Sequence, residues 1–230
     1  GSTDGTAEIA RGFTDARIRV IDQPNGGEAA ARNTALRHMK GEFVSFLDTD
    51  DAYYPEHLEV IVGRLRSDPS LDAAYSDGYY CDQSGTVLQT LSSRRLQPAE
   101  GCIFEQVVYS SSMLGPPLCV VLRRRLAEEL GLLFDTSITI GPDWDFFTRF
   151  SERARFAYVD RPTCLYRLHD TNITVSVGHA KRSADMAKCR RKAIRMDGFK
   201  RCSVGTRAAV FYDLLVNLLA GQPAAQSEVT

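Results

Sequence analysis

The sequence predicts an α/β fold: a mostly parallel sheet flanked by helices on both faces, with a helical extension at the C-terminus. Strand-like and helix-like segments alternate through the first half of the 230 residues. The run 43–47 is almost continuously apolar, as expected for a strand that is buried on both faces. Such alternation is typical of parallel sheets that lie between two layers of helices.

The elements follow from periodicity and from residues that favour turns. Pro55 stands at a favoured first-turn position of a helix, and Trp144, Phe147 and Phe150 are spaced three apart on an amphipathic one. Helices are predicted at residues 6–12, 28–39, 55–68, 103–109, 124–130, 142–152 and, with breaks, 178–220; strands are predicted at 18–21, 43–47, 73–81, 86–91, 118–122, 156–159 and 164–168.

The predicted organisation is one domain with an appendage. Residues 1–177 form the α/β domain, with a soft division near residue 115 between a part of about 1–114 and a part of about 115–177. Residues 178–230 form the helical extension. No internal repeat or low-complexity tract interrupts this arrangement.

The composition excludes several classes of protein. Lys and Arg number 28 against 29 acids, so the net charge of −1 indicates no nucleic-acid partner. The chain opens on polar residues, and no apolar run approaches the roughly 20 residues that span a bilayer. The six cysteines form no CxxC pair, which predicts reduced and mostly buried thiols in a cytoplasmic protein.

One segment departs from this even charge. Residues 179–207 contain ten Lys and Arg but only two acids, Asp185 and Asp197. A solvated helix face explains this excess most simply. The alternative is a surface that meets anionic lipid, which predicts peripheral contact with the inner face of the cell membrane.

The strongest chemical signal is the acidic cluster at residues 48–51. The apolar strand ends in three carboxylates within four residues, Asp48, Asp50 and Asp51. Ligands of open α/β sheets bind at the carboxyl ends of strands, and carboxylates this close favour a cation among them. Mg²⁺ or Mn²⁺ is expected, because these ions bridge carboxylates to substrate phosphates. A helix N-cap is the simpler reading, but a cap does not require three acids.

Three weaker signals accompany this cluster. Asn25-Gly26-Gly27 precedes a helix whose N-terminus could receive an anion, although a plain turn is the simpler reading. Asp143 and Asp145 lie at a helix start, where the helix dipole alone favours carboxylates. Segment 166–172 follows a strand and offers Arg167 for phosphate and His169 as a metal or phosphate ligand.

In order and spacing these segments resemble glycosyltransferase family 2. Residues 1–6, Gly-Ser-Thr-Asp-Gly-Thr, are similar to the family's DGSTDGT loop without its leading Asp. The series Asn25-Gly26-Gly27, Ala31-Arg32-Asn33, Gly41 and residues 46–51 resembles N-x-G…ARN…G…FLDxDD, Asp143-Trp144-Asp145 resembles the xDW segment, and Tyr166-Arg167-x-His169-x-x-Asn172 resembles YRxHxxN. The resemblance covers about residues 1–172. It also implies that the family's first strand, first helix and second strand precede Gly1.

The resemblance implies a GT-A fold and transfer of a sugar, with inversion, from a nucleoside diphosphate sugar to a glycan or lipid-linked acceptor. The donor would be bound by Asn25, Gly27, Arg32, Asp48, Thr49, Asp50 and Arg167. The metal would be held by Asp50 and His169. Asp143 would be the catalytic base, with Trp144 and Asp145 on the acceptor side. Pro142 stands where the family often has Glu, which loosens this last alignment.

Two other classes of protein fit parts of the pattern. A strand that ends in DxD also occurs in phosphatases of the haloacid dehalogenase type. That class expects Thr or Val two residues after the second Asp, where this chain has Ala52. A degenerate sugar-binding module without catalysis is the non-enzyme alternative. Retention of Asp48, Asp50 and Asp143 argues against it.

Overall fold

The computed structural model describes residues 1–221 of the chain. The α-helices are α1 (Thr6–Arg11), α2 (Gly27–His38), α3 (His57–Ser67), α4 (Phe104–Tyr109), α5 (Arg124–Glu129), α6 (Pro142–Ser151), α7 (Ile173–Ser176), α8 (His179–Ala193), α9 (Asp197–Arg201) and α10 (Val204–Ala220). The strands are β1 (Phe43–Ser45), β2 (Ala52–Tyr53), β3 (Ala73–Cys81), β4 (Val87–Thr90), β5 (Val120–Arg123) and β6 (Phe156–Arg167). There are also two 3₁₀ helices: η1 (Leu91–Arg94) directly follows β4, and η2 (Pro117–Cys119) directly precedes β5.

The sheet is mixed and mostly antiparallel, so the prediction of a mostly parallel sheet is wrong. Its order is β1-β5-β3-β6-β2, with β4 paired to β3. Among the described strands only β3 and β6 pair in parallel. The pairs β1–β5, β3–β5, β3–β4 and β2–β6 are antiparallel.

The prediction is wrong about which strands are neighbours in the sheet, more than about the directions in which they run. β1 and β3 both run opposite to β5, and β6 runs with β3, so β1, β3 and β6 point the same way. Strand–helix alternation predicts that common direction. It does not reveal that β5 enters the sheet between β1 and β3, or that the short strand β2 covers the far edge.

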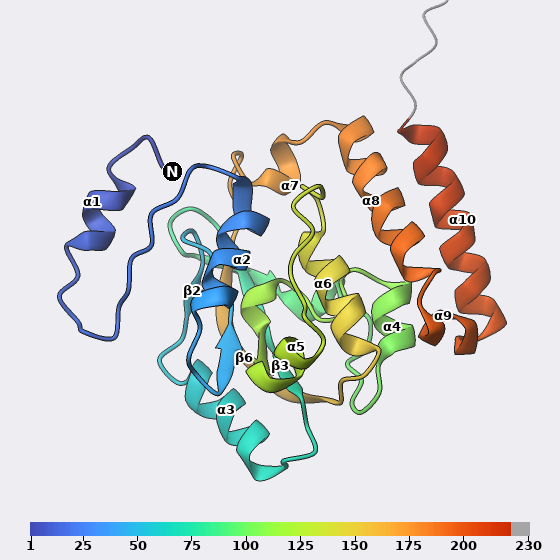
Figure 1. Cartoon of the computed structure of the whole chain (residues 1–230), viewed down its shortest axis with the longest axis horizontal. Helices are drawn as coiled ribbons and strands as arrows, with labels where there is room; N and C mark the ends of the chain where they lie inside the picture. The colour runs from blue at the N-terminus through green and yellow to red at the C-terminus, as the bar shows by residue number, and fades with distance from the viewer. Residues whose placement is uncertain (222–230) are drawn as a thin grey trace, which may run out of the picture.

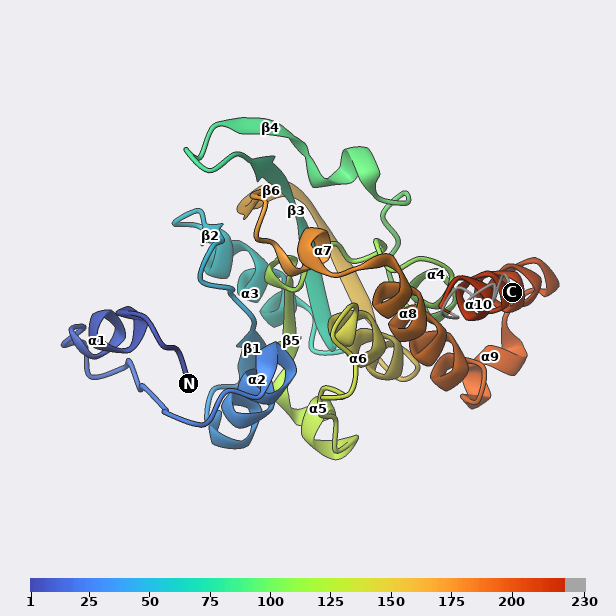
Figure 2. The ribbon, with the colours of Figure 1, turned by 90° about the horizontal axis from the view of Figure 1, so that it is seen from above.

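Helices cover both faces of the sheet, as the apolar strands predicted (Figures 1 and 2). Successive side chains of a strand point to opposite faces, and β5 shows this clearly. Val120 and Leu122 join the large core under α4, α5 and α6, whereas Val121 packs with Ile61 and Leu65 of α3. These two apolar clusters hold the sheet between its helical layers.

Most predicted elements occur near their predicted bounds, with three exceptions. Residues 18–21 form no strand and are exposed. Residues 156–159 and 164–168 belong to a single strand, β6, whose pairing with β3 is irregular between them. The strand β2 and the helix α7 were not predicted.

The C-terminal helices pack on the domain. α8 lies against α6 and α10, and α10 also contacts α4 (Figure 2). Residues 222–230 of the predicted extension lie outside the described part of the chain. No helix among residues 1–221 is both long and apolar enough to cross a bilayer.

The prediction of mostly buried cysteines is confirmed, and all six are free in the structure. Five of them are buried and Cys102 is exposed.

Candidate functional site

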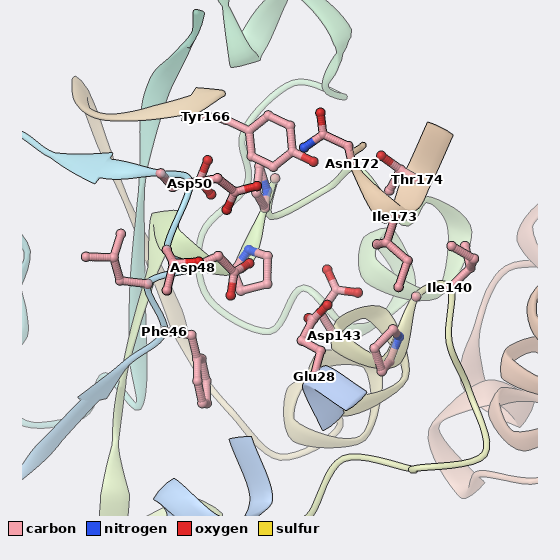
Figure 3. Close-up of a pocket in the computed structure, with 18 of the residues that line it drawn as sticks. Glu28, Phe46, Asp48, Asp50, Ile140, Asp143, Tyr166, Asn172, Ile173 and Thr174 are labelled. Carbon is pink, nitrogen blue, oxygen red and sulfur yellow. The ribbon is translucent and has the colours of Figure 1, made fainter. Parts of the chain in front are cut away.

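One large cavity collects most of the residues that the sequence singled out. It has a volume of about 900 Å³ and lies where β1 ends. Its walls come from α2, from the segment 45–51, from the turn 139–143 that begins α6, and from the segment 166–174 (Figure 3). The cavity thus joins segments more than 120 residues apart, and it is large enough for a small ligand of several rings.

The first wall is built around a buried arginine. Nη2 of Arg32 donates to both carboxylate oxygens of Asp48, at 2.8 and 2.9 Å. The same guanidinium pairs with Glu28, one helical turn earlier on α2. The guanidinium also lies over the rings of Phe46 and Phe134, at 5.7 and 5.4 Å. Arg32 therefore holds two carboxylates at the cavity from a fixed position.

Burial changes the acidity of Glu28. Loss of water around this carboxyl group raises its pKa to about 7, even though Arg32 pulls the pKa down. The nearby charges of Asp48, Asp143 and Asp50 act in the same direction as burial. Glu28 therefore changes its charge near neutral pH.

Asp50 and His169 form a second polar pair in the cavity. Nε2 of His169 lies 3.0 Å from Oδ2 of Asp50. The histidine is fixed from behind, because its Nδ1 meets Oγ1 of Thr171 at 2.7 Å and its backbone N–H donates to Asn172 at 2.6 Å. An oxygen and an imidazole nitrogen are thereby presented side by side.

The third acid of the cluster, Asp51, faces inward. Its Oδ1 accepts from the backbone N–H of Arg167 at 2.9 Å, and its Oδ2 is buried without a hydrogen-bond partner. Burial raises the pKa of Asp51 to about 7. This carboxyl group connects the acidic loop to the end of β6.

Asp143 faces the acidic cluster from the opposite wall. It lies in the first turn of α6, after Gly141, whose φ of 79° is readily adopted only by glycine. Figure 3 shows Asp143 and Glu28 close together on one side of the cavity, opposite Asp48 and Asp50. Burial raises the pKa of Asp143, whereas the charge of Arg32 lowers it. A carboxylate with a raised pKa is a stronger base when it is ionised.

Two neighbours of Asp143 do not line the cavity. Trp144 is buried among α4, α6 and α8, where its indole N–H donates to the carbonyl of Val107 at 2.7 Å. Asp145 is buried and binds Arg149 and Lys192, at 2.7 and 2.8 Å. Helical spacing turns the side chain of Asp145 away from that of Asp143. These placements do not support the predicted acceptor contacts of Trp144 and Asp145.

Among the predicted donor residues, Arg32, Asp48, Thr49 and Asp50 line this cavity, but three others do not. Asn25 and Gly27 line a smaller cavity of about 500 Å³, which shares lining residues of α2 with the first. The guanidinium of Arg167 donates to the backbone carbonyls of Asp50 and Gln83, each at 2.8 Å. That side chain braces the acidic loop instead of reaching into the cavity.

The structure adds two charged residues that the sequence reasoning missed. Glu28 was missed although it stands four residues before Arg32, a spacing at which Glu and Arg pair on a helix. Arg94, from η1, also lines the cavity, and its guanidinium lies over the ring of Tyr80 at 4.9 Å. No local pattern indicates Arg94, because the fold alone brings it to this site.

The predicted divalent cation has two candidate ligands. Within residues 1–221 no group of three or more His, Cys, Asp or Glu is arranged to hold a metal. The Asp50 and His169 pair fits a Mg²⁺ or Mn²⁺ ion whose other ligands come from water and phosphate, since such ions are commonly held by one or two protein groups and substrate.

Comparison with known proteins defines the class. The sequence model described as "Glycosyl transferase family 2" matches residues 1–131, more than half of the chain. The chain therefore belongs to glycosyl transferase family 2.

Particular relatives sharpen the comparison. The chain is 29% identical to chondroitin synthase of Escherichia coli over 180 residues, which are 76% of this chain and 24% of that protein. It is also 29% identical to the uncharacterized glycosyltransferase EpsJ of Bacillus subtilis over 181 residues, 76% of this chain and 52% of EpsJ. The chain thus spans about a quarter of one of these two relatives and about half of the other.

Solved structures share the fold. S. aureus TarS 1–349 in complex with UDP-GlcNAc matches with a TM-score of 0.69 and 17% identity, over 94% of this chain and 60% of that one. The mannosyltransferase PcManGT from Pyrobaculum calidifontis, in complex with GDP-Man and Mn²⁺, matches with a TM-score of 0.61 and 20% identity, over 96% and 62%. The resemblance to a GT-A glycosyltransferase is thereby confirmed at the level of fold.

Proposed function

We propose that this domain transfers a sugar, with inversion, from a nucleoside diphosphate sugar to an acceptor hydroxyl. The observation that carries the proposal is the pair of facing walls. Asp48 and Asp50 stand on one side of the cavity, and Asp143 stands on the other. An inverting transfer needs this separation, because the leaving group and the attacking hydroxyl lie on opposite faces of the sugar.

The acidic loop forms the donor side. Asp48, held by Arg32, is suited to accept hydrogen bonds from nucleoside hydroxyl groups, and Thr49 adds a further polar group. Asp50 and His169 would hold the metal beside the diphosphate. A bound Mg²⁺ or Mn²⁺ would supply positive charge where negative charge develops on the leaving diphosphate.

Asp143 acts as the general base. As the acceptor oxygen forms its bond to the anomeric carbon, the bond from that carbon to the diphosphate breaks. The proton of the acceptor hydroxyl passes to the carboxylate of Asp143. The raised pKa of Asp143 supports this role, because it makes the ionised carboxylate a stronger base. Turnover should then fall as the pH drops through the pKa of Asp143.

The decisive experiment measures turnover of defined donors. UDP-GlcNAc and GDP-Man are the first choices, because they are bound by the structural relatives. With Mn²⁺ present, the protein should release nucleoside diphosphate by slow hydrolysis of one donor, and faster when a suitable acceptor is supplied. Binding of a donor without any turnover across a broad acceptor set would indicate the non-catalytic sugar-binding module. Release of inorganic phosphate from simple phosphate esters would indicate the phosphatase.

A glycan or lipid-linked acceptor remains part of the proposal, together with peripheral contact to anionic membrane. Ion pairs within the chain neutralise part of the basic stretch 179–207: Lys181 pairs with Asp185, Arg190 with Asp213, and Lys192 with Asp135. The exposed cations Arg191, Arg195 and Arg201 lie at the junction of α8, α9 and α10 and favour anionic lipid. Flotation with phosphatidylserine vesicles should weaken with salt, and binding that ignores lipid charge would contradict this contact.

A further inference from the structure

The turn that carries Asp143 is held by α8, a helix of the C-terminal region. Residues 139–143 line the cavity, and α8 packs directly behind them. The carboxylate of Asp185, fully buried on α8, accepts from the backbone N–H groups of Thr139 and Ile140 at 2.9 and 3.0 Å. One side chain thus ties two consecutive amides of the turn.

Other contacts tighten the same junction. Nζ of Lys188 donates to the carbonyl of Ser137 at 2.8 Å, and Sγ of Cys189 lies 3.6 Å from the carbonyl of Gly141. A Cβ on Gly141 would lie only 2.7 Å from Cε of Met186. A side chain at position 141 would have to displace the flexible end of Met186, and the positive φ of Gly141 would strain it as well.

Two lysines of α8 balance the negative charge of Asp185. Nζ of Lys181, one turn earlier on α8, donates to it at 2.6 Å, and Nζ of Lys188 lies 3.7 Å away. The hydrogen bonds from Lys181 and from the two amides lower the pKa of Asp185 against the effect of burial. A buried carboxylate in such a set of donors is fixed in position, because each lost partner would leave a charge unsatisfied.

We infer that Asp185 is a positioning residue for the acceptor side of the reaction, and that α8 belongs to the catalytic unit. Asp185 acts through the turn 139–141, which sets the start of α6 and hence the carboxylate of Asp143. The donor side gains nothing from this contact, because Arg32, Asp48 and Asp50 are held by α2, by each other and by His169. This inference rests on the proposed function.

The test uses the full chain and compares Asp185→Asn with the control Asp197→Asn. Asp197 is another acid of the C-terminal helices, and its exposed carboxylate pairs with Lys200 of the same helix, α9, at 2.8 Å. Three measurements are made: amide hydrogen exchange over residues 136–146, calorimetric binding of UDP with Mn²⁺, and turnover of UDP-GlcNAc.

Asp185→Asn should speed exchange at Thr139 and Ile140 by about 10-fold or more and lower turnover by about 10-fold, since small misplacements of a reacting group cost this much. UDP affinity should stay within about twofold, and Asp197→Asn should change none of the three. Exchange and turnover equal to those of the control would overturn the inference. So would an equal loss of UDP affinity and turnover, which marks a general structural role. If the wild type binds UDP but turns over no donor, the proposed function fails, while the exchange result still reports on the turn.

Discussion

The two walls of the cavity are built by different means. The donor wall, as proposed, is made of side-chain charge pairs between elements near one another in sequence, from Arg32 to Asp50, completed by His169. The proposed acceptor wall is a backbone turn, residues 139–143, shaped by a glycine and held from behind by the distant helix α8. One wall is defined by which residues are present, and the other by what packs behind them.

This difference indicates which substitutions each wall should tolerate. A charge pair fails when one residue is replaced, so the donor wall should respond sharply to single substitutions within it. The acceptor wall can be altered from outside the cavity, by residues that never meet substrate. The predictions below test whether the two walls do act separately.

The largest effect is expected at the acceptor wall. Asp143→Asn should lower turnover of donor and acceptor by about 10²-fold or more, because it removes the proposed general base, while the affinity for UDP with Mn²⁺ changes little. Initial-rate kinetics and calorimetry on the same preparation measure both quantities.

The neighbouring acid supplies the matched control. Asp145→Asn should retain most of the turnover and lower the melting temperature instead, because Asp145 is buried between Arg149 and Lys192. Loss of turnover in Asp145→Asn together with activity in Asp143→Asn would show that the base is misassigned.

A smaller effect is expected at the metal position of the donor wall. Asp50→Asn should weaken the Mn²⁺-dependent part of UDP binding by roughly 10-fold or more, the scale on which changes around a metal act. Titrations of UDP with and without Mn²⁺ isolate that part. Equal affinities with and without the ion in the wild type would remove the metal from the proposal.

The smallest effect concerns the charge of Glu28. Its pKa is raised from 4.5 to about 7, so the folded protein binds a proton that the unfolded chain releases. Stability of the empty protein should therefore fall as pH rises from about 4.5 to 7 and then level off. Glu28→Gln should reduce this fall by about 2 °C in melting temperature, a modest change because solvent screens the charge.

Thermal unfolding between pH 5 and 8 provides the measurement. The control is Glu128→Gln, which removes an exposed carboxylate paired with Arg124 at the same helical spacing. Asp51 keeps part of the pH dependence in both variants, because its pKa is also raised to about 7. Parallel curves for the wild type and Glu28→Gln would show that Glu28 is not the titrating group.

More of the residues predicted for the donor line the cavity than of those predicted for the acceptor. Asp48, Asp50 and Arg32 are close enough in the chain for a motif to carry their relation, and they do meet in the cavity. Trp144 shows the limit. Its spacing with Phe147 and Phe150 indicates a buried helix face, and α4 and α8 do bury it, so it does not serve as a wall for a sugar.

The fold shows the same limit. Strand β3 was predicted at its observed bounds, because most of its residues are buried, whichever face of the sheet they point to. The place of β5 between β1 and β3 depends on pairing across some 50 to 80 residues, which local periodicity does not contain. Arg94 and Asp185 were missed for the same reason, since each acts on segments distant from it in the chain.

Five carboxyl groups, those of Glu28, Asp48, Asp50, Asp51 and Asp143, surround one cavity with few cations among them. Selection for heat resistance in the absence of ligand would favour neutral residues at Glu28, Asp51 and Asp143, because burial raises the pKa of these three carboxyl groups and so disfavours their charged forms. Such a selection would discard the groups on which the proposed chemistry depends. Libraries for a more robust domain should therefore leave these acids and Asp185 fixed, and should vary surface positions away from the cavity instead.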